Sequence, residues 1–147
     1  MKKVIFSIVF ALGLAGAASA QVSANAIGLR FGGGNTEISF QHALSSINRL
    51  EADLGFWYDG GFALNGVYQW TFDLSALSPG FNWYVGPGAA LSIFNSNINI
   101  GIGGQIGIEY KFDIPLQLSL DYRPTFYLLD NWGFISNDVG LGIRYTF

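Results

Sequence analysis

The last ten residues of the chain, Asp138-Val-Gly-Leu-Gly-Ile-Arg-Tyr-Thr-Phe147, decide the fold class. Apolar or aromatic residues occupy every odd position, and polar residues or glycine occupy every even position. Strict alternation over ten residues predicts a β-strand with one apolar and one polar face. The fold is therefore expected to be built from strands that separate the two kinds of side chain.

The same alternation recurs towards the N-terminus and predicts eight antiparallel strands. Residues 97–112 are the most regular case, with isoleucines on one face and Asn, Gln, Glu and Lys on the other. Short turn sequences such as Gly32-Gly33-Gly34-Asn35 and Asp113-Ile114-Pro115 separate neighbouring strands. The expected strands span residues 25–32, 36–44, 47–58, 62–74, 80–94, 97–112, 116–129 and 136–147.

The first twenty residues are expected to be a cleaved signal peptide. Lys2 and Lys3 precede an apolar run over residues 4–14, and Ala18-Ser19-Ala20 has the pattern of a cleavage site. The apolar run is much shorter than the roughly 20 residues that a membrane-spanning helix needs. The expected organisation is a signal peptide over residues 1–20 and a single β domain over residues 21–147.

The composition is unusual for a water-soluble domain. Of the 147 residues, 50% are hydrophobic, 12% are charged, 20 are glycine and none is cysteine, whereas soluble domains carry about 25% charged residues. The absence of cysteine excludes a disulfide scaffold and a Cys-ligated metal module. A net charge of −3 argues against a nucleic-acid partner, because phosphate neutralisation needs an excess of Lys and Arg. No metal or cofactor motif is present, so no cofactor is expected.

The placement of the charges indicates which strand face is outside. Every charged residue of a strand lies on a polar face, and these faces also carry many glycines, which suit a crowded interior. An eight-stranded barrel has just enough room for its inward side chains, so about five large apolar residues from each strand would not fit inside. The apolar faces are therefore expected to point outward into lipid. The expected lumen charge network consists of Arg30, Glu37, Arg49, Glu51, Asp53, Glu109, Lys111, Asp121, Arg123, Asp138 and Arg144.

Aromatic residues on the apolar faces gather near the strand ends. Two aromatic girdles around an aliphatic band are typical of a β-barrel in a bilayer. The girdle at the end that holds both termini is expected to contain Trp70, Phe72, Phe81, Trp83, Tyr110 and Phe112, together with Tyr145 and Phe147. The opposite girdle is expected to contain Phe31, Phe56, Tyr58, Phe62 and Phe126.

In these features the chain resembles the small eight-stranded outer-membrane barrels of the OmpA and OmpX type. The resemblance covers residues 21–147 and is most specific at the C-terminus, where Ile143, Tyr145 and Phe147 alternate on the outward face. In that class such an ending is the signal read by the outer-membrane insertion machinery. The resemblance implies a monomer in the outer membrane of a Gram-negative bacterium, in contact with membrane lipid and lipopolysaccharide.

Three functions stay open at this stage. A packed, charged lumen favours a structural role in the envelope without catalysis, and a narrow or gated channel is the first alternative. The second alternative is a lipid A-modifying enzyme, because some barrels that resemble this one have that activity. The single histidine, His42, lies on the outward face near the termini, and Ala43-Leu44 separates it from Ser45, so the deacylase family's H-x-S arrangement is missing.

The hairpins also allow predictions of register. They are expected to place Arg30 opposite Glu37, Arg49 opposite Thr71, Glu51 opposite Gln69, Gln105 opposite Arg123 and Gly107 opposite Asp121. Pro87 and Pro124 lie within strands, where proline has no N–H to donate, so a bulge or kink is expected at each.

Overall fold

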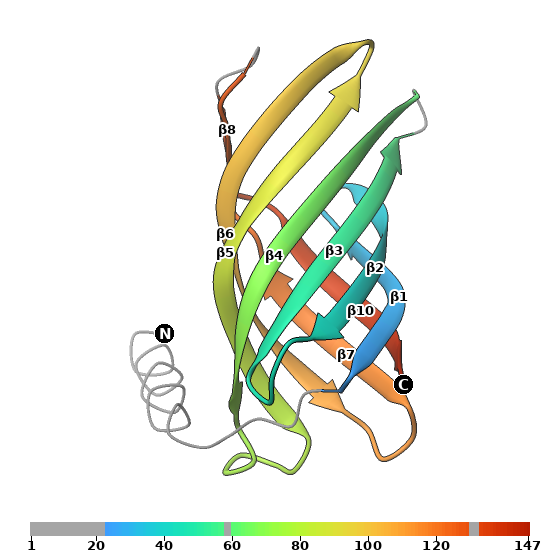
Figure 1. The fold of residues 1–147 in the computed structure, drawn as a ribbon, viewed down its shortest axis with the longest axis vertical. Helices are drawn as coiled ribbons and strands as arrows, with labels where there is room; N and C mark the ends of the chain where they lie inside the picture. The colour runs from blue at the N-terminus through green and yellow to red at the C-terminus, as the bar shows by residue number, and fades with distance from the viewer. Residues whose placement is uncertain (1–22, 58–59, 130–132) are drawn as a thin grey trace.

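A computed structural model of the chain describes residues 23–57, 60–129 and 133–147. They form a closed antiparallel β-barrel (Figure 1). The expected signal peptide, residues 1–20, and Tyr58 lie outside the described residues. Within them, no helix has the length and apolar character needed to cross a membrane. The strands are β1 Asn25–Gly32, β2 Asn35–Ala43, β3 Asn48–Trp57, β4 Gly61–Asp73, β5 Phe81–Phe94, β6 Asn97–Lys111, β7 Leu116–Tyr122, β8 Thr125–Tyr127, β9 Gly133–Ile135 and β10 Val139–Thr146.

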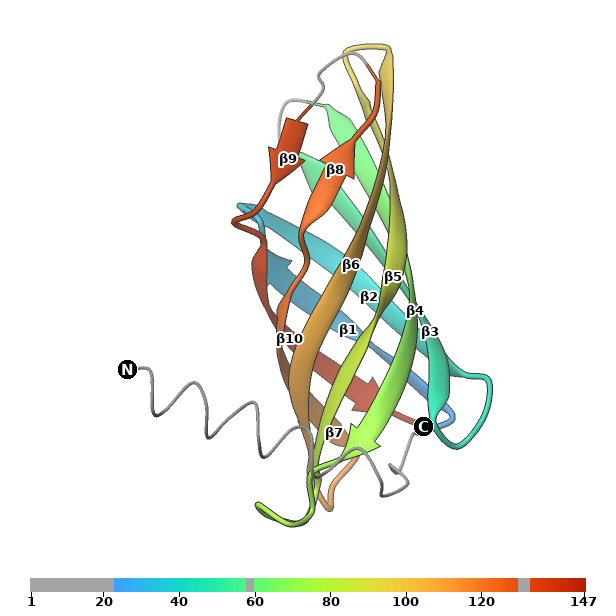
Figure 2. The ribbon, with the colours of Figure 1, turned by 90° about the vertical axis from the view of Figure 1, so that its left-hand side faces the viewer.

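The barrel has eight strand positions, as the alternation predicts. Each strand pairs with its neighbour in the sequence, and β10 pairs with β1 to close the sheet. The seventh position is shared by β7 and β8, and the eighth by β9 and β10 (Figure 2). Both ends of the sheet meet where the Asn25 amide donates to Phe147 O over 3.0 Å. We call this end of the barrel the termini end, and the opposite end the far end.

Two tight turns at the far end set the register of their hairpins. Asn95 and Ser96 link β5 to β6 with φ angles of 48° and 64°, the left-handed values that a type I′ turn requires at both central positions. Gly33 and Gly34 link β1 to β2 with φ angles of 61° and 76°, which glycine adopts without steric cost. These turns pair Phe94 with Asn97, and Gly32 with Asn35.

The two faces of the sheet are sorted as the alternation predicts. Along β10, residues are exposed and buried in strict alternation. The buried residues of the barrel are mostly charged or amide side chains, whereas large apolar side chains are exposed on the outside. This distribution is the inverse of the one found in a water-soluble domain.

The predicted registers are partly confirmed. Arg30 pairs with Glu37, and the register of β6 agrees on both sides of Pro124, with Gly107 opposite Asp121 and Gly103 opposite Thr125.

The expected register of β3 against β4 is wrong by two residues. Arg49 lies opposite Gln69 rather than Thr71, and Glu51 lies opposite Val67 rather than Gln69. A shift of two residues keeps every side chain on its face, so alternation does not distinguish the two registers. The actual register follows from the turn, where the Gly60 amide donates to Trp57 O over 3.1 Å.

Of the bulge or kink expected at Pro87, the register excludes the bulge. Pro87 pairs with Gly104 in β6, and the register against β4 is the same on both sides of it, at Val67–Gly88 and Trp70–Val85. Instead, the pairing of β5 with β4 is interrupted at Gly86 and Pro87 and resumes on both sides. The two strands come so close here that a Cβ on Gly86 would lie 1.6 Å from Tyr68 O.

The irregularity expected at Pro124 is confirmed. The proline divides β7 from β8, which are separated by two residues, 123 and 124. The neighbouring pair, β9 and β10, is separated by three residues, 136–138. The extra residue is a β-bulge, which bends the strand and redirects side chains. The Arg123 amide donates to Asp138 O over 2.9 Å, so the bulge holds these two charged residues next to each other.

Candidate functional site

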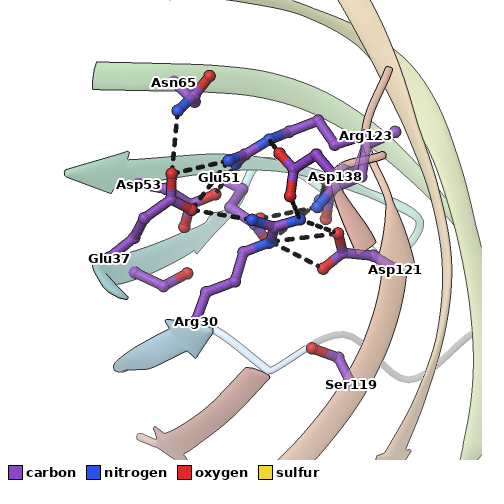
Figure 3. A network of polar contacts seen from close by, with 12 residues as sticks. Arg30, Glu37, Glu51, Asp53, Asn65, Ser119, Asp121, Arg123 and Asp138 are labelled. Carbon is purple, nitrogen blue, oxygen red and sulfur yellow. Dashed lines mark hydrogen bonds and ion pairs between the residues drawn. The ribbon is translucent and has the colours of Figure 1, made fainter. Parts of the chain in front are cut away.

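The buried charges of the lumen form two connected clusters. The first, here called the acid-rich cluster, lies towards the far end and consists of Arg30, Glu37, Asp53, Asp121, Arg123 and Asp138 (Figure 3). The second, the amide-rich cluster, lies towards the termini end and consists of Gln41, Arg49, Glu51, Gln69, Gln105, Glu109, Gln117 and Arg144. Together they place side chains from every strand position of the barrel except that of β5 in one interior.

Arg30 of β1 is fully buried in the acid-rich cluster. Its Nη2 donates to Asp121 Oδ1 over 2.6 Å and to Asp138 Oδ1 over 2.9 Å. Its Nε lies 3.1 Å from both carboxylate oxygens of Asp121, and Nη1 donates to Glu37 over 3.1 Å. Charge-assisted contacts of this kind are about twice as strong as neutral ones. A single guanidinium thus connects three carboxylates, one from β2, one from β7 and one from the segment before β10.

Arg123, at the proline break, connects the remaining acid to the same group. Its Nη1 donates to Asp53 over 2.8 Å, its Nη2 to Glu37 over 2.7 Å, and its Nε to Asp138 over 3.1 Å. Glu37 and Asp138 therefore bridge both arginines. This is the cross-linked arrangement that offsets the cost of removing charges from water.

The acid-rich cluster contains more acids than bases. Two guanidinium groups face four carboxyl groups, so its formal charge is −2 if all are ionised. Most of the carboxylate oxygens accept a hydrogen bond, but Asp53 Oδ1 is buried without a partner among the described residues. The excess negative charge is concentrated at this end of the lumen.

The amide-rich cluster is balanced. Glu51 accepts from Gln41 over 2.5 Å, from Gln69 over 3.1 Å and from Arg144 over 3.3 Å. Arg144 also donates to Ser39 and Ser119, which line the wall beside it.

The second ion pair of this cluster lies beside an aromatic ring. Arg49 binds Glu109 over 2.9 Å and Gln69 Oε1 over 2.5 Å. Its guanidinium carbon lies 4.9 Å from the centroid of the buried Tyr84 ring. Arg49 is therefore held by an acid, an amide and a π face.

Glycines on the inner face make room for these large groups. A Cβ on Gly142 would lie 2.3 Å from Ser119 Oγ and 2.5 Å from Arg144 Nη1, and a Cβ on Gly107 would lie 2.5 Å from the Tyr84 ring. The lumen-facing glycines expected from the sequence thus adjoin the bulkiest buried side chains.

Most of the predicted network residues lie in these two clusters, but Lys111 does not. It is half-buried at the termini end and forms no ion pair among the residues that the structure describes. Alternation places Lys111 on the inner face, but its position at the last residue of β6 leaves it at the mouth. The network residues that the sequence did not predict are mainly amides (Gln41, Gln69, Gln105, Gln117) and Asn65, and the sequence indicates Gln69 and Gln105 only as cross-strand partners of Glu51 and Arg123. The alternation places these side chains on the polar, inward faces of their strands, and this pattern could have indicated that they join the network.

The predicted girdle residues lie on the outside at the termini end, in contacting pairs. Phe72 stacks on Trp83 with centroids 4.5 Å apart, and Tyr110 contacts Phe81 at 4.8 Å. Tyr110 also contacts Phe112, Trp70 contacts Tyr68, and Tyr145 stacks on Phe147. The predicted insertion signal, Ile143, Tyr145 and Phe147, is exposed on the same outer face.

The described side-chain contact of His42 is with an amide of β1. Its Nδ1 lies 2.9 Å from Asn25 Oδ1 on the exposed outer face. Within the described ranges, no group of three or more His, Cys, Asp or Glu side chains has an arrangement that could hold a metal ion.

Comparison with protein-family models, with curated proteins and with solved structures finds no match to this chain.

Proposed function

We propose that this protein is an integral β-barrel of the bacterial outer membrane, monomeric, with a structural role in the envelope and without catalytic activity. One observation carries the proposal: charged side chains are buried and paired inside the barrel, while its outer face is apolar. The resemblance to barrels of the OmpA and OmpX type supports the same assignment.

The outer face of β6 illustrates why lipid is the better solvent. Five isoleucines on this face are each between 42% and 55% exposed: Ile98, Ile100, Ile102, Ile106 and Ile108. Burying such a side chain gains about 1.5–3 kcal/mol relative to leaving it in water. In a bilayer this gain is realised without any protein partner, and the pairing of β10 with β1 satisfies backbone groups that an open sheet would expose to lipid.

The aromatic pairs at the termini end support a membrane boundary there. Aromatic girdles mark the interfaces of transmembrane barrels, and Trp and Tyr favour headgroup depth. The outward Ile143, Tyr145 and Phe147 would be the signal read by the insertion machinery. The orientation we propose places the termini end on the periplasmic side.

The packed lumen favours a structural role over a channel. Arg30 and Asp121 are fully buried as a pair, and Tyr84 and Gln69 fill the interior nearer the termini end. Eight-stranded barrels enclose just enough space for their own side chains.

The test of the architecture is migration on gels after folding into micelles or vesicles. A closed barrel should migrate differently before and after boiling, and an unshifted band would count against it. Recording currents across planar bilayers tests the structural role, and we expect no porin-sized conductance. Lipid A mass spectra of a deletion strain should be unchanged if the protein is not a lipid A-modifying enzyme.

A further inference from the structure

A pocket lies outside the two charge clusters, at the termini end of the barrel. Its volume is about 650 Å³, within the range of pockets that hold small ligands. The β4–β5 turn forms one side of the pocket, and the ends of β4 and β6 form the other. Its polar and charged lining includes Asp73, Ser78, Asn82, Lys111 and Asp113.

Charges of both signs are held apart around this pocket. Asp73 is fixed by Ser75, whose amide and hydroxyl donate to its two carboxylate oxygens over 2.8 Å and 2.7 Å. The Lys111 backbone is tied to the turn by its amide, which donates to Gly80 O over 2.9 Å. No acid among the described residues lies within 4.0 Å of the Lys111 ammonium, which has three hydrogens to donate. A ligand that carries both a cation and an anion would satisfy both sides of the pocket.

The aromatic lining indicates where this ligand comes from. Tyr110 and Phe112 contact each other at 4.6 Å and line the pocket next to Lys111. Tyr110 also belongs to the aromatic belt through Phe81. If the barrel spans the outer membrane, this belt lies at the level of the phospholipid headgroups.

We propose that this pocket binds the phosphoethanolamine headgroup of a phospholipid in the inner leaflet, with its phosphate on Lys111 and its ammonium on Asp73 and Asp113. The proposal rests on the proposed function, because that function places the pocket at the leaflet. Phosphatidylglycerol lacks the ammonium group, so it would lose the contacts with the two acids. Phosphatidylcholine has no N–H to donate to them.

The experiment measures binding of short-chain phosphatidylethanolamine, phosphatidylglycerol and phosphatidylcholine to the full barrel, folded in micelles, by native mass spectrometry. We expect phosphatidylethanolamine to bind about tenfold more tightly than the other two, which corresponds to a total loss of about 1.4 kcal/mol when the contacts with the two acids are missing. Asp73→Asn should remove this preference, whereas Lys111→Gln should weaken the binding of all three lipids, because each of them carries the phosphate. His42→Gln is the matched control, because it changes an exposed side chain near the termini outside the pocket.

Glycerophosphoethanolamine, which has no acyl chains, distinguishes the headgroup from the lipid as a whole. It should displace phosphatidylethanolamine from the wild-type barrel, and failure to displace it would contradict headgroup recognition. Equal binding of the three lipids, an unchanged preference in Asp73→Asn, or an unchanged affinity for all three lipids in Lys111→Gln would overturn the proposal. Heat-modified migration of every variant is checked first. A barrel that inserts into bilayers but does not discriminate among the lipids would refute this inference alone, whereas a chain that does not insert would refute the proposed function.

Discussion

Gly140 of β10 lies directly against the guanidinium of Arg30, so that a Cβ atom on Gly140 would be 2.4 Å from Arg30 Cζ. Arg30 cannot move aside without losing its contacts with Asp121 and Asp138. We therefore expect Gly140→Ala to lower the free energy of unfolding by about 1–3 kcal/mol, the usual cost of overpacking. Urea unfolding in micelles, followed by tryptophan fluorescence, measures the change.

Gly66→Ala is the control for this substitution. Gly66 lies on the outer face of β4, and a Cβ there would meet no atom within 4 Å. This variant should unfold at the wild-type urea concentration. Equal effects of the two substitutions would show that the lumen is looser than the contact between Gly140 and Arg30 implies.

The second prediction concerns the ion pair between Arg30 and Asp121. Arg30→Met should destabilise the barrel by about 3–5 kcal/mol, because it leaves buried carboxylates without their guanidinium. Adding Asp121→Leu should recover part of the loss, giving a coupling energy of about 1–3 kcal/mol in a double-mutant cycle. Additive effects within about 0.5 kcal/mol would mean that the two residues do not interact.

The third prediction separates assembly from stability at the C-terminus. Phe147 and Phe134 are similarly exposed, at 58% and 60%, but only Phe147 directly follows the last strand, β10. We expect Phe147→Ala to reduce the amount of folded barrel in the outer membrane of cells severalfold, while Phe134→Ala leaves it unchanged. Both variants should refold equally well in detergent micelles, where no insertion machinery takes part. An equal loss in cells for the two variants would argue against a C-terminal signal.

The fourth prediction concerns membrane depth. In a variant that keeps Trp83 as its only tryptophan, lipids brominated close to the headgroup should quench fluorescence more than lipids brominated near the chain ends. The comparison variant places the only tryptophan at position 141, where Leu141 is exposed on the outer face of β10. There the deep bromines should quench more strongly. The same depth profile at both positions would contradict a spanning barrel.

The fold was predictable because alternation is a local property. Residues 97–112 and 138–147 reveal their two faces without any knowledge of their neighbours, and β6 and β10 have these faces in the structure. The inward position of Arg30, Asp121 and Arg144 followed in the same way. The irregularity at Pro124 was predictable too, because the missing N–H is a property of that residue alone.

The strand registers and the side-chain contacts across the lumen were harder to predict from the sequence. The position of Glu51 opposite Val67 depends on the tight turn at Gly60, and a two-residue shift would have kept the same faces. Pro87 shows that an in-strand proline can be absorbed without a bulge, by a local gap in the pairing with the neighbouring strand.

The sequence by itself therefore determined the number of strand positions, the face of each side chain and the inverted distribution of polarity. Only the tertiary structure decided that Arg30 binds Asp121, which lies 91 residues away, that Glu37 and Asp138 bridge two arginines, and that Lys111 stays apart at the mouth. The physical reason is that alternation depends on the backbone of one strand, whereas contacts across the lumen depend on closure, stagger and a bulge, which all the strands set together.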